Sequence, residues 1–278
     1  MKNISASNAI LTGASKGLGV HIARALAKEG VNLVLTARSA DALEQVREEM
    51  LTYDVKAEVI PADLTETDQI DSLIAEAEKK LGPIDILINN AGIEISTPYE
   101  EFSPDDIQKM ITLNLTVPML LARAVMPGML KRKRGHIVNI SSLAGKTGFP
   151  TQTPYAASKA GLNMFTHSLR VELADTQIGA SVVCPGFVSD DGMYARMEER
   201  AGPAPKILKP TTPEKVASGV VRCIKKNISE LIINPLPMKP LFMLQEAVPG
   251  IKTTLHKAFG TPEYAKKVSQ NRSEKETQ

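Results

Sequence analysis

Short apolar runs rich in branched side chains alternate with amphipathic stretches along most of the chain. Each run is too short for a buried helix and is apolar at both odd and even positions, as strands are when both faces of a sheet are covered. We therefore predict a parallel sheet whose strands lie at Asn8–Thr12, Val31–Thr36, Ala57–Ile60, Ile84–Asn89, His136–Ile140, Ser181–Cys184 and Leu231–Ile233.

The stretches between these strands repeat apolar residues with helical spacing, and several carry helix-end signals. Thr212 can cap a helix that has Pro213 at its first position, whereas Gly30, Gly82 and Gly135 follow helices where a left-handed residue is useful. Right-handed crossovers then give a doubly wound α/β fold with helices on both faces of the sheet. The predicted helices are Leu18–Glu29, Ala40–Leu51, Asp68–Leu81, Asp105–Leu130, Pro154–Leu173 and Pro213–Lys226.

The regular alternation weakens after Gly186. Residues 189–210 are rich in proline, glycine and charge, and residues 234–278 begin with apolar side chains interrupted by prolines. The last residues, 268–278, are polar, and we expect them to fray. A chain of 278 residues favours one large α/β domain. We therefore predict a single domain over residues 1–278, with a loop at 189–210 and a C-terminal extension at 234–278.

Composition argues against several classes of protein. The net charge of +2 is too balanced for a protein whose main partner is nucleic acid. No stretch reaches the ~20 apolar residues of a membrane span, and we find no export signal. Cys184 and Cys223 lie among apolar residues, which favours buried free thiols and a reducing, cytoplasmic location. The histidines are scattered along the chain, so we predict no metal site.

A glycine-rich turn directly follows the first predicted strand and opens the next helix. Its sequence, Thr12-Gly13-Ala14-Ser15-Lys16-Gly17-Leu18-Gly19, permits close approach of the backbone to a pyrophosphate, and the helix N-terminus supplies free N–H groups. Glycines also serve ordinary turns, but the strand–turn–helix context favours a dinucleotide. The predicted cofactor-binding residues of this turn are Gly13, Ser15, Lys16, Gly17, Leu18 and Gly19.

A tyrosine and a lysine share one face of the helix predicted over residues 154–173. Tyr155 and Lys159 are separated by one helical turn, and an ammonium group beside a phenol is expected to lower the pKa of the phenol from about 10. Such a phenol can exchange a proton with a substrate oxygen that the hydroxyl of Ser142 holds. The alternative is an ordinary surface pair on an amphipathic helix, which Ser142 at the end of a strand makes less attractive.

The chain resembles the short-chain dehydrogenase/reductase family from about Asn8 to Ile233. The glycine turn has the spacing T-G-x-x-x-G-x-G, and further motifs follow in the order of the family. The resemblance implies a Rossmann fold with a seven-stranded parallel sheet of order 3-2-1-4-5-6-7, and an oxidoreductase that acts on a carbonyl or alcohol group. The motifs are Asn89-Asn90-Ala91-Gly92, Asn114, Ser141-Ser142, Tyr155-Ala156-Ala157-Ser158-Lys159 and Pro185-Gly186.

The resemblance also assigns roles to single residues. Tyr155 would donate a proton, and Ser142 would orient the substrate oxygen. Lys159 would also bind the nicotinamide ribose, and Asn114, which alone would be an uninformative mid-helix residue, would hold a water in a proton relay. Hydride transfer belongs to the cofactor. The family further implies a homodimer or homotetramer formed through the two longest helices. The other implied cofactor contacts are Asp63, Leu64, Asn90, Ala91, Gly92, Tyr155, Lys159, Pro185, Gly186 and Val188.

The end of the second strand distinguishes the two nicotinamide cofactors. Relatives that prefer NAD tend to carry an acidic residue there, whereas this chain has Ala37 followed by Arg38. A guanidinium binds a 2′-phosphate in a bidentate manner, and Lys16 adds a second cation at the same mouth. We therefore favour NADP(H) over the alternative that both are solvated charges. Asp63 resembles the acid that contacts adenine in the family, although it could simply cap the following helix.

The chain departs from the family pattern after Pro185-Gly186. The family commonly has a threonine there that touches the nicotinamide, and Asp190 occupies its place, with Ser189 as the alternative contact. The loop at 189–210 is expected to cover the substrate, as lids do in the family. The extension either packs on this loop or on a partner subunit, or forms a peripheral membrane contact or a wall for a lipid-like substrate.

The leading hypothesis is reduction of a ketone or aldehyde, such as a 3-oxoacyl compound or another lipophilic carbonyl. A fold of this kind hosts many substrates, so the substrate class stays open. One alternative is a catalytically idle protein that binds NADPH or a partner, which the intact set of Ser142, Tyr155 and Lys159 disfavours. Another is a membrane-peripheral protein that acts through its extension.

Overall fold

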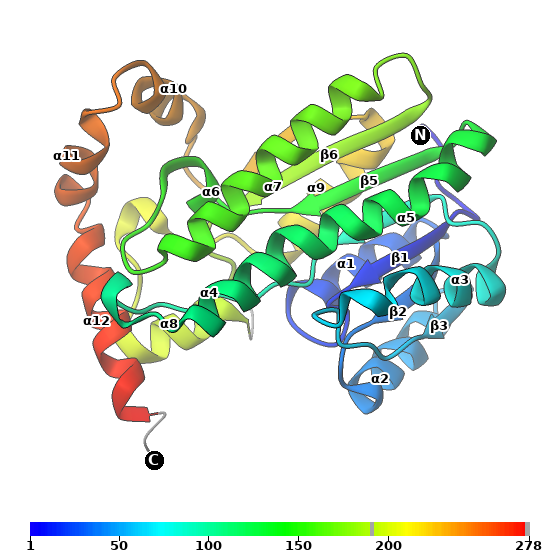
Figure 1. Ribbon diagram of the computed structural model, residues 1–278, viewed down its shortest axis with the longest axis horizontal. Coiled ribbons are helices and arrows are strands. Elements are labelled where there is room, and N and C mark those ends of the chain that lie inside the picture. The colour runs from blue at the N-terminus through cyan, green and yellow to red at the C-terminus, as the bar shows by residue number, and fades with distance from the viewer. Residues whose placement is uncertain (190–191, 276–278) are drawn as a thin grey trace.

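A seven-stranded parallel sheet forms the centre of the molecule (Figure 1). The computed structural model describes residues 1–189 and 192–275, with side chains as far as residue 270, so the contact predicted at Asp190 lies outside the described residues. The strand order β3-β2-β1-β4-β5-β6-β7 confirms the predicted topology. The strands are β1 (Asn8–Thr12), β2 (Asn32–Thr36), β3 (Ala57–Val59), β4 (Ile86–Asn89), β5 (Gly135–Ile140), β6 (Ile178–Pro185) and β7 (Glu230–Ile233).

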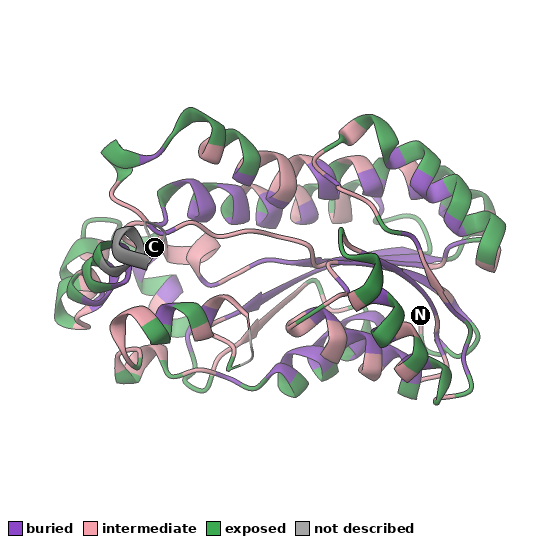
Figure 2. Cartoon of the chain, turned by 90° about the horizontal axis from the view of Figure 1, so that it is seen from below, coloured by how far each residue is buried: buried purple, intermediate pink, exposed green. Residues whose placement is uncertain are grey.

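Helices cover both faces of the sheet, and their buried sides are turned towards the strands (Figure 2). One face carries α1 (Leu18–Lys28), α2 (Ala40–Leu51) and α9 (Pro213–Lys226), whose apolar residues form one core with the strands. The other face carries α3 (Ile70–Leu81), α5 (Val117–Arg132) and α7 (Thr153–Glu172). This two-sided cover explains why the strands are apolar at odd and even positions alike.

The carboxyl ends of the parallel strands meet along one edge of the sheet. The register pairs Leu11 of β1 with Leu35 of β2 and with Ile88 of β4, so these three strands end together. Ligands of open parallel sheets bind at this edge, where the order of the strands reverses. The reversal lies here between β1 and β4, and it brings the turns that follow these two strands into contact.

The long helix predicted over residues 105–130 is interrupted in its middle. It consists of α4 (Pro104–Ile111), a π-helical turn η3 (Thr112–Thr116) and α5, with Asn114 fully buried inside the π-helical turn. The continuous run Pro104–Arg132 is long and apolar enough to match a membrane span by length and composition. In this fold the run packs against the sheet, α3 and α7, which accounts for much of its apolar content.

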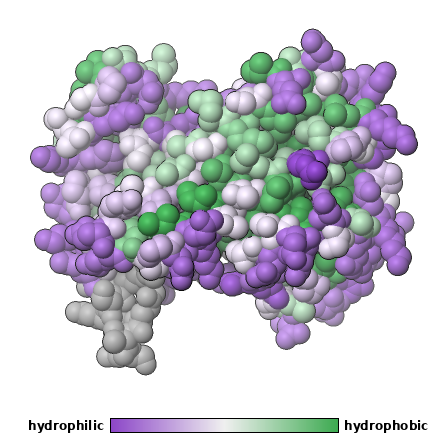
Figure 3. All heavy atoms as spheres, in the orientation of Figure 1, coloured by the Kyte–Doolittle hydropathy of each residue, from purple (hydrophilic) through white to green (hydrophobic). Residues whose placement is uncertain are grey.

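Part of the α5 and α7 surface that faces away from the sheet is also apolar. Met119 and Leu130 of α5 are about two-fifths exposed, and Met164 and Val171 of α7 are 65% and 76% exposed. Figure 3 shows apolar side chains gathered over the region where Figure 1 places these two helices. Single exposed apolar residues are ordinary, but a contiguous group of them marks a surface that can bind a partner.

One of the three predicted helix-ending glycines has a different role. Gly30 and Gly82 adopt positive φ after α1 and α3, as predicted, but after α5 it is Lys133 that is left-handed, with φ of 53°. Gly135 instead opens β5, where a Cβ atom would lie 2.5 Å from the Met129 sulfur. The residue is small because a helix side chain packs onto the strand at that point.

The region after β6 is more helical than its composition suggested. It contains α8 (Met193–Ala201), η4 (Lys206–Leu208), α10 (Lys239–Ala247), α11 (Ile251–Ala258) and α12 (Thr261–Lys275), and the last three line up at one end of the molecule (Figure 1). The fraying predicted for residues 268–278 begins too early, because Val268 of α12 is buried in a cluster with Tyr264 and with Met197 of α8. Shorter elements are η1 (Thr67–Gln69), η2 (Tyr99–Glu101) and α6 (Ala144–Thr147).

Candidate active site

A cavity of about 680 Å³ opens at the carboxyl edge of the sheet. Its volume lies in the range of small-molecule sites. Every predicted site residue among those described lines it except Asn114, although these residues come from turns and helices spread between positions 13 and 188. The predicted residues that line it are Gly13, Ser15, Lys16, Gly17, Leu18, Gly19, Arg38, Asp63, Leu64, Asn90, Ala91, Gly92, Ser142, Tyr155, Lys159, Pro185, Gly186 and Val188.

The glycine-rich turn is locked to the turn that follows β4. Thr12 Oγ1 accepts hydrogen bonds from the main-chain N–H groups of Asn90 and Ala91, each at 2.9 Å, while Asn90 Nδ2 donates to the Thr12 carbonyl at 3.0 Å. A Cβ atom at Gly13 would lie 2.9 Å from Ala91 Cα, and Gly13 has a φ of 65°. Only glycine satisfies both the conformation and this close approach.

Helix α1 begins at this turn without a side-chain cap. Its N-cap residue, Gly17, has a φ of 54° and supplies no side-chain cap, and Leu18 and Gly19 at the start of the helix line the cavity. The first N–H groups of a helix without such a cap are available to a ligand. Such a terminus binds the negative charge of a phosphate group. This feature is what a dinucleotide site at the turn requires.

Cationic side chains stand at the same mouth. Arg38 and Lys16 both line the cavity and are exposed, and neither forms an ion pair with the residues that the structure describes. Asp63 accepts hydrogen bonds from the Thr65 hydroxyl at 2.7 Å and the Thr65 N–H at 3.0 Å, and these bonds lower its pKa. Asp63 therefore stabilises the turn at Thr65 and does not cap the helix that follows, because the N-cap residues there are Glu66 for η1 and Gln69 for α3. Asp63 also lines the cavity.

The predicted catalytic side chains meet deeper in the cavity. Tyr155 and Lys159 are 8% and 4% exposed, and the Lys159 ammonium lies 5.8 Å from the centre of the Tyr155 ring. Lys159 Nζ donates to the Ile140 carbonyl at the end of β5 at 2.9 Å. Ser142 is the second residue after that strand, and its side chain forms a hydrogen bond with Tyr155. The surface-pair alternative for Tyr155 and Lys159 is wrong, because both residues are buried in the cavity wall.

The titration of this pair differs from the sequence expectation. Burial raises the pKa of Tyr155 well above its usual value of 10, and the hydrogen bond with Ser142 opposes this rise. Burial lowers the pKa of Lys159 to about 8. The prediction that Lys159 lowers the pKa of the phenol is thus wrong for this structure, since it neglected the removal of both groups from water. At neutral pH the phenol keeps the proton that a general acid must donate.

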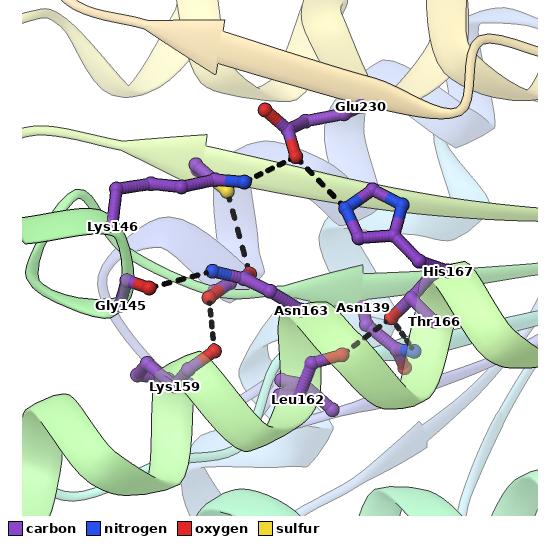
Figure 4. Close-up of polar contacts among 11 residues, drawn as sticks. Asn139, Gly145, Lys146, Lys159, Leu162, Asn163, Thr166, His167 and Glu230 are labelled. Carbon is purple, nitrogen blue, oxygen red and sulfur yellow. Dashed lines mark hydrogen bonds and ion pairs between the residues drawn. The ribbon is translucent and has the colours of Figure 1, made fainter. Parts of the chain in front are cut away.

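Polar side chains hold α7 against α6 and the sheet (Figure 4). Asn163 Nδ2 donates to the Gly145 carbonyl at 3.1 Å and Asn163 Oδ1 accepts from the Cys184 thiol at 3.5 Å. Ser141 Oγ donates to the Lys159 carbonyl at 3.1 Å. These bonds tie α7 to α6 and to strands β5 and β6. The position of Tyr155 relative to the sheet is therefore set by several independent contacts.

A second group of side chains joins the same helix to β7 (Figure 4). The carboxylate of Glu230 contacts the ammonium of Lys146 and, at 3.0 Å, the Nε2 atom of His167. Burial opposes ionisation of Glu230, but the hydrogen bonds with Lys146 and His167 lower its pKa overall. Because Lys146 lies in α6, just after Ser142, this group holds the serine segment and α7 to one strand.

Asn114 does not line the cavity. Its Oδ1 atom accepts from the Ile93 N–H and its Nδ2 atom donates to the Ile93 carbonyl, both at 2.9 Å, with a further bond to Ser158 Oγ at 3.2 Å. The side chain thus fixes the course of the chain after Gly92. A Cβ atom on Gly92 would lie 3.0 Å from Asn114 Oδ1 and 3.4 Å from Lys159 Nζ.

Sequence reasoning missed a buried polar group next to Tyr155. Glu94 lines the cavity, and its Oε1 atom accepts hydrogen bonds from Ser96 Oγ and, at 3.0 Å, from Gln152 Nε2. A carboxylate between Ile93 and Ile95 directly after the Asn-Asn-Ala-Gly motif was the available signal. Gln152 gave none, because its position depends on the path of the loop that precedes α7.

The far side of the cavity is apolar. It is built by α8, by the segment before α7 and by the extension, which are far apart in the sequence. Phe187 stacks on Tyr194 with ring centres 5.0 Å apart, and Phe149 meets Phe187 edge-on at 6.1 Å. The apolar side chains of this wall are Phe149, Phe187, Met193, Tyr194, Met197, Leu208, Met238, Leu241, Phe242 and Phe259.

Comparison with known proteins identifies the family. The model of the short chain dehydrogenase family matches residues 7–201. Ketoacyl reductase HetN of Nostoc sp. is 42% identical over 98% of this chain and 96% of its own length. The 3-oxoacyl-[acyl-carrier-protein] reductase of Synechocystis sp. is 39% identical over 69% of this chain and 78% of its own.

A solved structure gives the same answer. The crystal structure of a metagenomic short-chain oxidoreductase in complex with NADP superposes with a TM-score of 0.72 and 34% identity, and the match covers 84% of this chain and 99% of that one. The chain belongs to the short-chain dehydrogenase/reductase family. It is an oxidoreductase of that family, and the match to the Nostoc reductase spans the extension that lies beyond the family model.

Proposed function

We propose that the protein is an NADPH-dependent reductase of a ketone or aldehyde, in particular of a 3-oxoacyl compound or another lipophilic carbonyl. The observation that carries the proposal is the single cavity in which Ser142, Tyr155 and Lys159 face an apolar wall. Two relatives whose names specify ketoacyl or 3-oxoacyl reduction support the substrate class.

The cofactor side of the cavity fits NADP(H). The uncapped N-terminus of α1 would hold the pyrophosphate, and Arg38 with Lys16 would bind the 2′-phosphate. The Lys159 ammonium would bind the nicotinamide ribose. A related structure is a complex with NADP, which supports the same choice. The bound cofactor would supply the hydride, so the protein itself must deliver only a proton and the correct geometry.

The proton would come from Tyr155. Its buried phenol keeps its proton at neutral pH, and Ser142 would donate a second hydrogen bond to the same substrate oxygen. As the carbonyl carbon accepts hydride, the oxygen takes the phenolic proton and the product is an alcohol. Both polar atoms of the Asn114 side chain are hydrogen-bonded to the main chain of Ile93. We therefore assign a main-chain carbonyl of this π-helical turn as the group that would accept a hydrogen bond from the relay water.

NADPH oxidation at 340 nm against a panel of carbonyl compounds tests the proposal. The panel contains 3-oxoacyl thioesters, medium and long aldehydes, steroid ketones and small diketones. We expect preferential turnover of the acyl or long-chain members, because the wall opposite Tyr155 is apolar. Intact NADPH binding without turnover of any member would favour the catalytically idle alternative instead.

We further propose a homodimer or homotetramer assembled through α5 and α7. The exposed apolar side chains of Met119, Leu130, Met164 and Val171 support this assignment. Met164→Glu, which places a charge in the middle of the surface, should lower the mass measured by light scattering. A reducing, cytoplasmic location is proposed as well, because Cys184 and Cys223 are buried free thiols.

A second candidate function is a peripheral membrane contact through α10. Met243 is 73% exposed, and Leu236, Leu244 and Val248 are between 44% and 50% exposed, next to the wall formed by Leu241 and Phe242. Such a surface would take a lipophilic substrate directly from a bilayer. Co-sedimentation with phospholipid vesicles tests it: Met243→Glu should reduce binding and Leu51→Glu on α2 should not.

A further inference from the structure

Glu94 occupies an unusual position for a carboxylate. It follows the turn after β4, lines the cavity beside Tyr155, and is set so deep that burial raises its pKa. Its negative charge also contributes to the raised pKa of Tyr155, which places the two groups within electrostatic reach of each other. A carboxylate removed from water in this way costs free energy unless its oxygens are hydrogen-bonded.

Among the residues that the structure describes, only one of the two carboxylate oxygens of Glu94 has hydrogen-bond partners. Oε1 accepts hydrogen bonds from Ser96 Oγ and Gln152 Nε2, whose side chains are 2% and 3% exposed. Oε2 makes no hydrogen bond with the residues that the structure describes, and it is not among the fully enclosed unpaired atoms. Glu94 keeps part of its surface exposed, and that part faces the cavity.

The support for Glu94 is rigid and connected to the catalytic helix. Gln152 is the N-cap residue of α7, one helical turn before Tyr155, and its Nε2 atom also lies 3.2 Å from Ser96 Oγ and 3.9 Å from the Met197 sulfur. The orientation of Glu94 is therefore fixed relative to Tyr155 and to α8. The guanidinium groups of Arg196 and Arg200 on α8 favour its ionised form.

We propose that Glu94 forms an acceptor subsite beside Tyr155, in which Oε2 binds a hydroxyl or amide N–H group of the carbonyl substrate. The inference rests on the proposed reductase function and narrows it. The substrate class becomes a carbonyl compound with an apolar chain and a hydrogen-bond donor. A 3-oxoacyl thioester with an amide in its thiol arm has this character, and so does an acyloin.

The subsite makes a distinct prediction about selectivity. A buried acceptor rejects analogues that lack the donor, because the acceptor then loses its solvation without gaining a partner. The ratio of kcat/KM between a substrate with the donor and its analogue without the donor measures this effect alone. Damage to the fold lowers both values and leaves their ratio unchanged.

Two matched substrate pairs test the inference on the full-length protein with NADPH. The first is a 3-oxoacyl N-acetylcysteamine thioester and its analogue methylated on the amide nitrogen, which has no N–H group. The second is an acyloin and the ketone without its hydroxyl. In the wild-type protein the donor-bearing member of at least one pair should be preferred by about tenfold or more in kcat/KM. Glu94→Gln, which keeps the shape but loses the charge, should reduce this preference, and Glu94→Ala should abolish it.

Glu100→Gln is the matched control, because Glu100 is exposed and lies on the same segment outside the cavity. This control should keep the wild-type preference. Wild-type ratios near one for both pairs, or ratios that persist in both Glu94 variants, would overturn the inference while the observed turnover upholds the reductase function. Turnover of other carbonyl compounds of the panel but of none of these four would overturn the subsite alone. Wild-type protein that oxidises NADPH with no compound of either set would overturn the reductase function, and the subsite with it.

Discussion

The two sides of the cavity are built in different ways. The cofactor side consists of tight turns after β1, β2 and β4, where Thr12 and Asn90 bind one another's main chains and Gly13 leaves no room for a side chain. The substrate side consists of bulky side chains, such as Phe187, Met197 and Phe242, from segments that are far apart in the sequence. The first is shaped by the backbone and the second by packing.

This difference predicts how each side responds to change. On the cofactor and catalytic side, each charged group or proton donor has a fixed position, so removal of a single group is expected to abolish its function. On the apolar wall, a substitution that shortens a side chain removes a few methylene groups from contact with the substrate. Each buried methylene group contributes about 0.8 kcal/mol. Substitutions on the catalytic and cofactor side should therefore have large effects on every substrate, whereas those on the wall should have small effects that depend on the substrate.

The largest effect is expected for Tyr155→Phe. The change removes the proton donor but keeps the ring, so turnover should fall roughly 10²- to 10⁴-fold while NADPH affinity stays close to the wild-type value. Steady-state kinetics together with fluorescence titration of NADPH measure both quantities. Tyr99→Phe, at a residue 62% exposed outside the cavity, is the control. Substantial activity left in Tyr155→Phe would show that another group is the acid.

The same contrast explains which features the sequence predicted. The placement of Lys159 on the same helix face as Tyr155 follows from local spacing, and the order of the strands follows from the family resemblance, so both were predicted without a structure. Glu94 and Gln152 meet only because the loop before α7 returns to β4, so no local pattern pairs them. The raised pKa of Tyr155 was also missed, since burial is a property of the fold and not of the helix face.

Lys159→Met should stabilise the fold while it abolishes turnover. Burial lowers the pKa of Lys159 from 10.5 to about 8, so the folded protein holds this proton less tightly than the unfolded chain. Below pH 8 the charged side chain therefore destabilises the wild-type fold by about 3 kcal/mol, and this cost fades as the pH rises from 8 to 10.5.

Denaturant unfolding at pH 7 and pH 10 measures this cost. The variant should be more stable than the wild-type protein at pH 7, with a smaller difference at pH 10. Lys56→Met, at an exposed lysine, should show no such dependence on pH. A variant less stable than the wild-type protein at pH 7 would mean that the hydrogen bond to the Ile140 carbonyl outweighs the cost of burial.

A smaller effect is expected for Arg38→Asp, which exchanges the cation at the end of β2 for a carboxylate. Loss of a charged hydrogen bond to the 2′-phosphate is worth about 1.5–3 kcal/mol, so the NADPH-to-NADH ratio of kcat/KM should fall roughly 10- to 100-fold. Arg222→Asp on α9 makes the same charge change outside the cavity and should leave the ratio as it is. An unchanged ratio in Arg38→Asp would place the 2′-phosphate elsewhere.

The smallest effect is expected on the apolar wall, at Leu241→Ala. Leu241 lines the cavity and is only partly buried, so shortening it removes contact with a long acyl chain more than it disturbs the core. The KM for long-chain substrates should rise about 3- to 10-fold, whereas the KM for short ketones should hardly change. Leu244→Ala is the matched control, because this leucine lies on the same helix and is 44% exposed outside the cavity. Equal changes for long and short substrates would mean that the wall acts through the catalytic groups, and the two sides of the cavity would then not be independent.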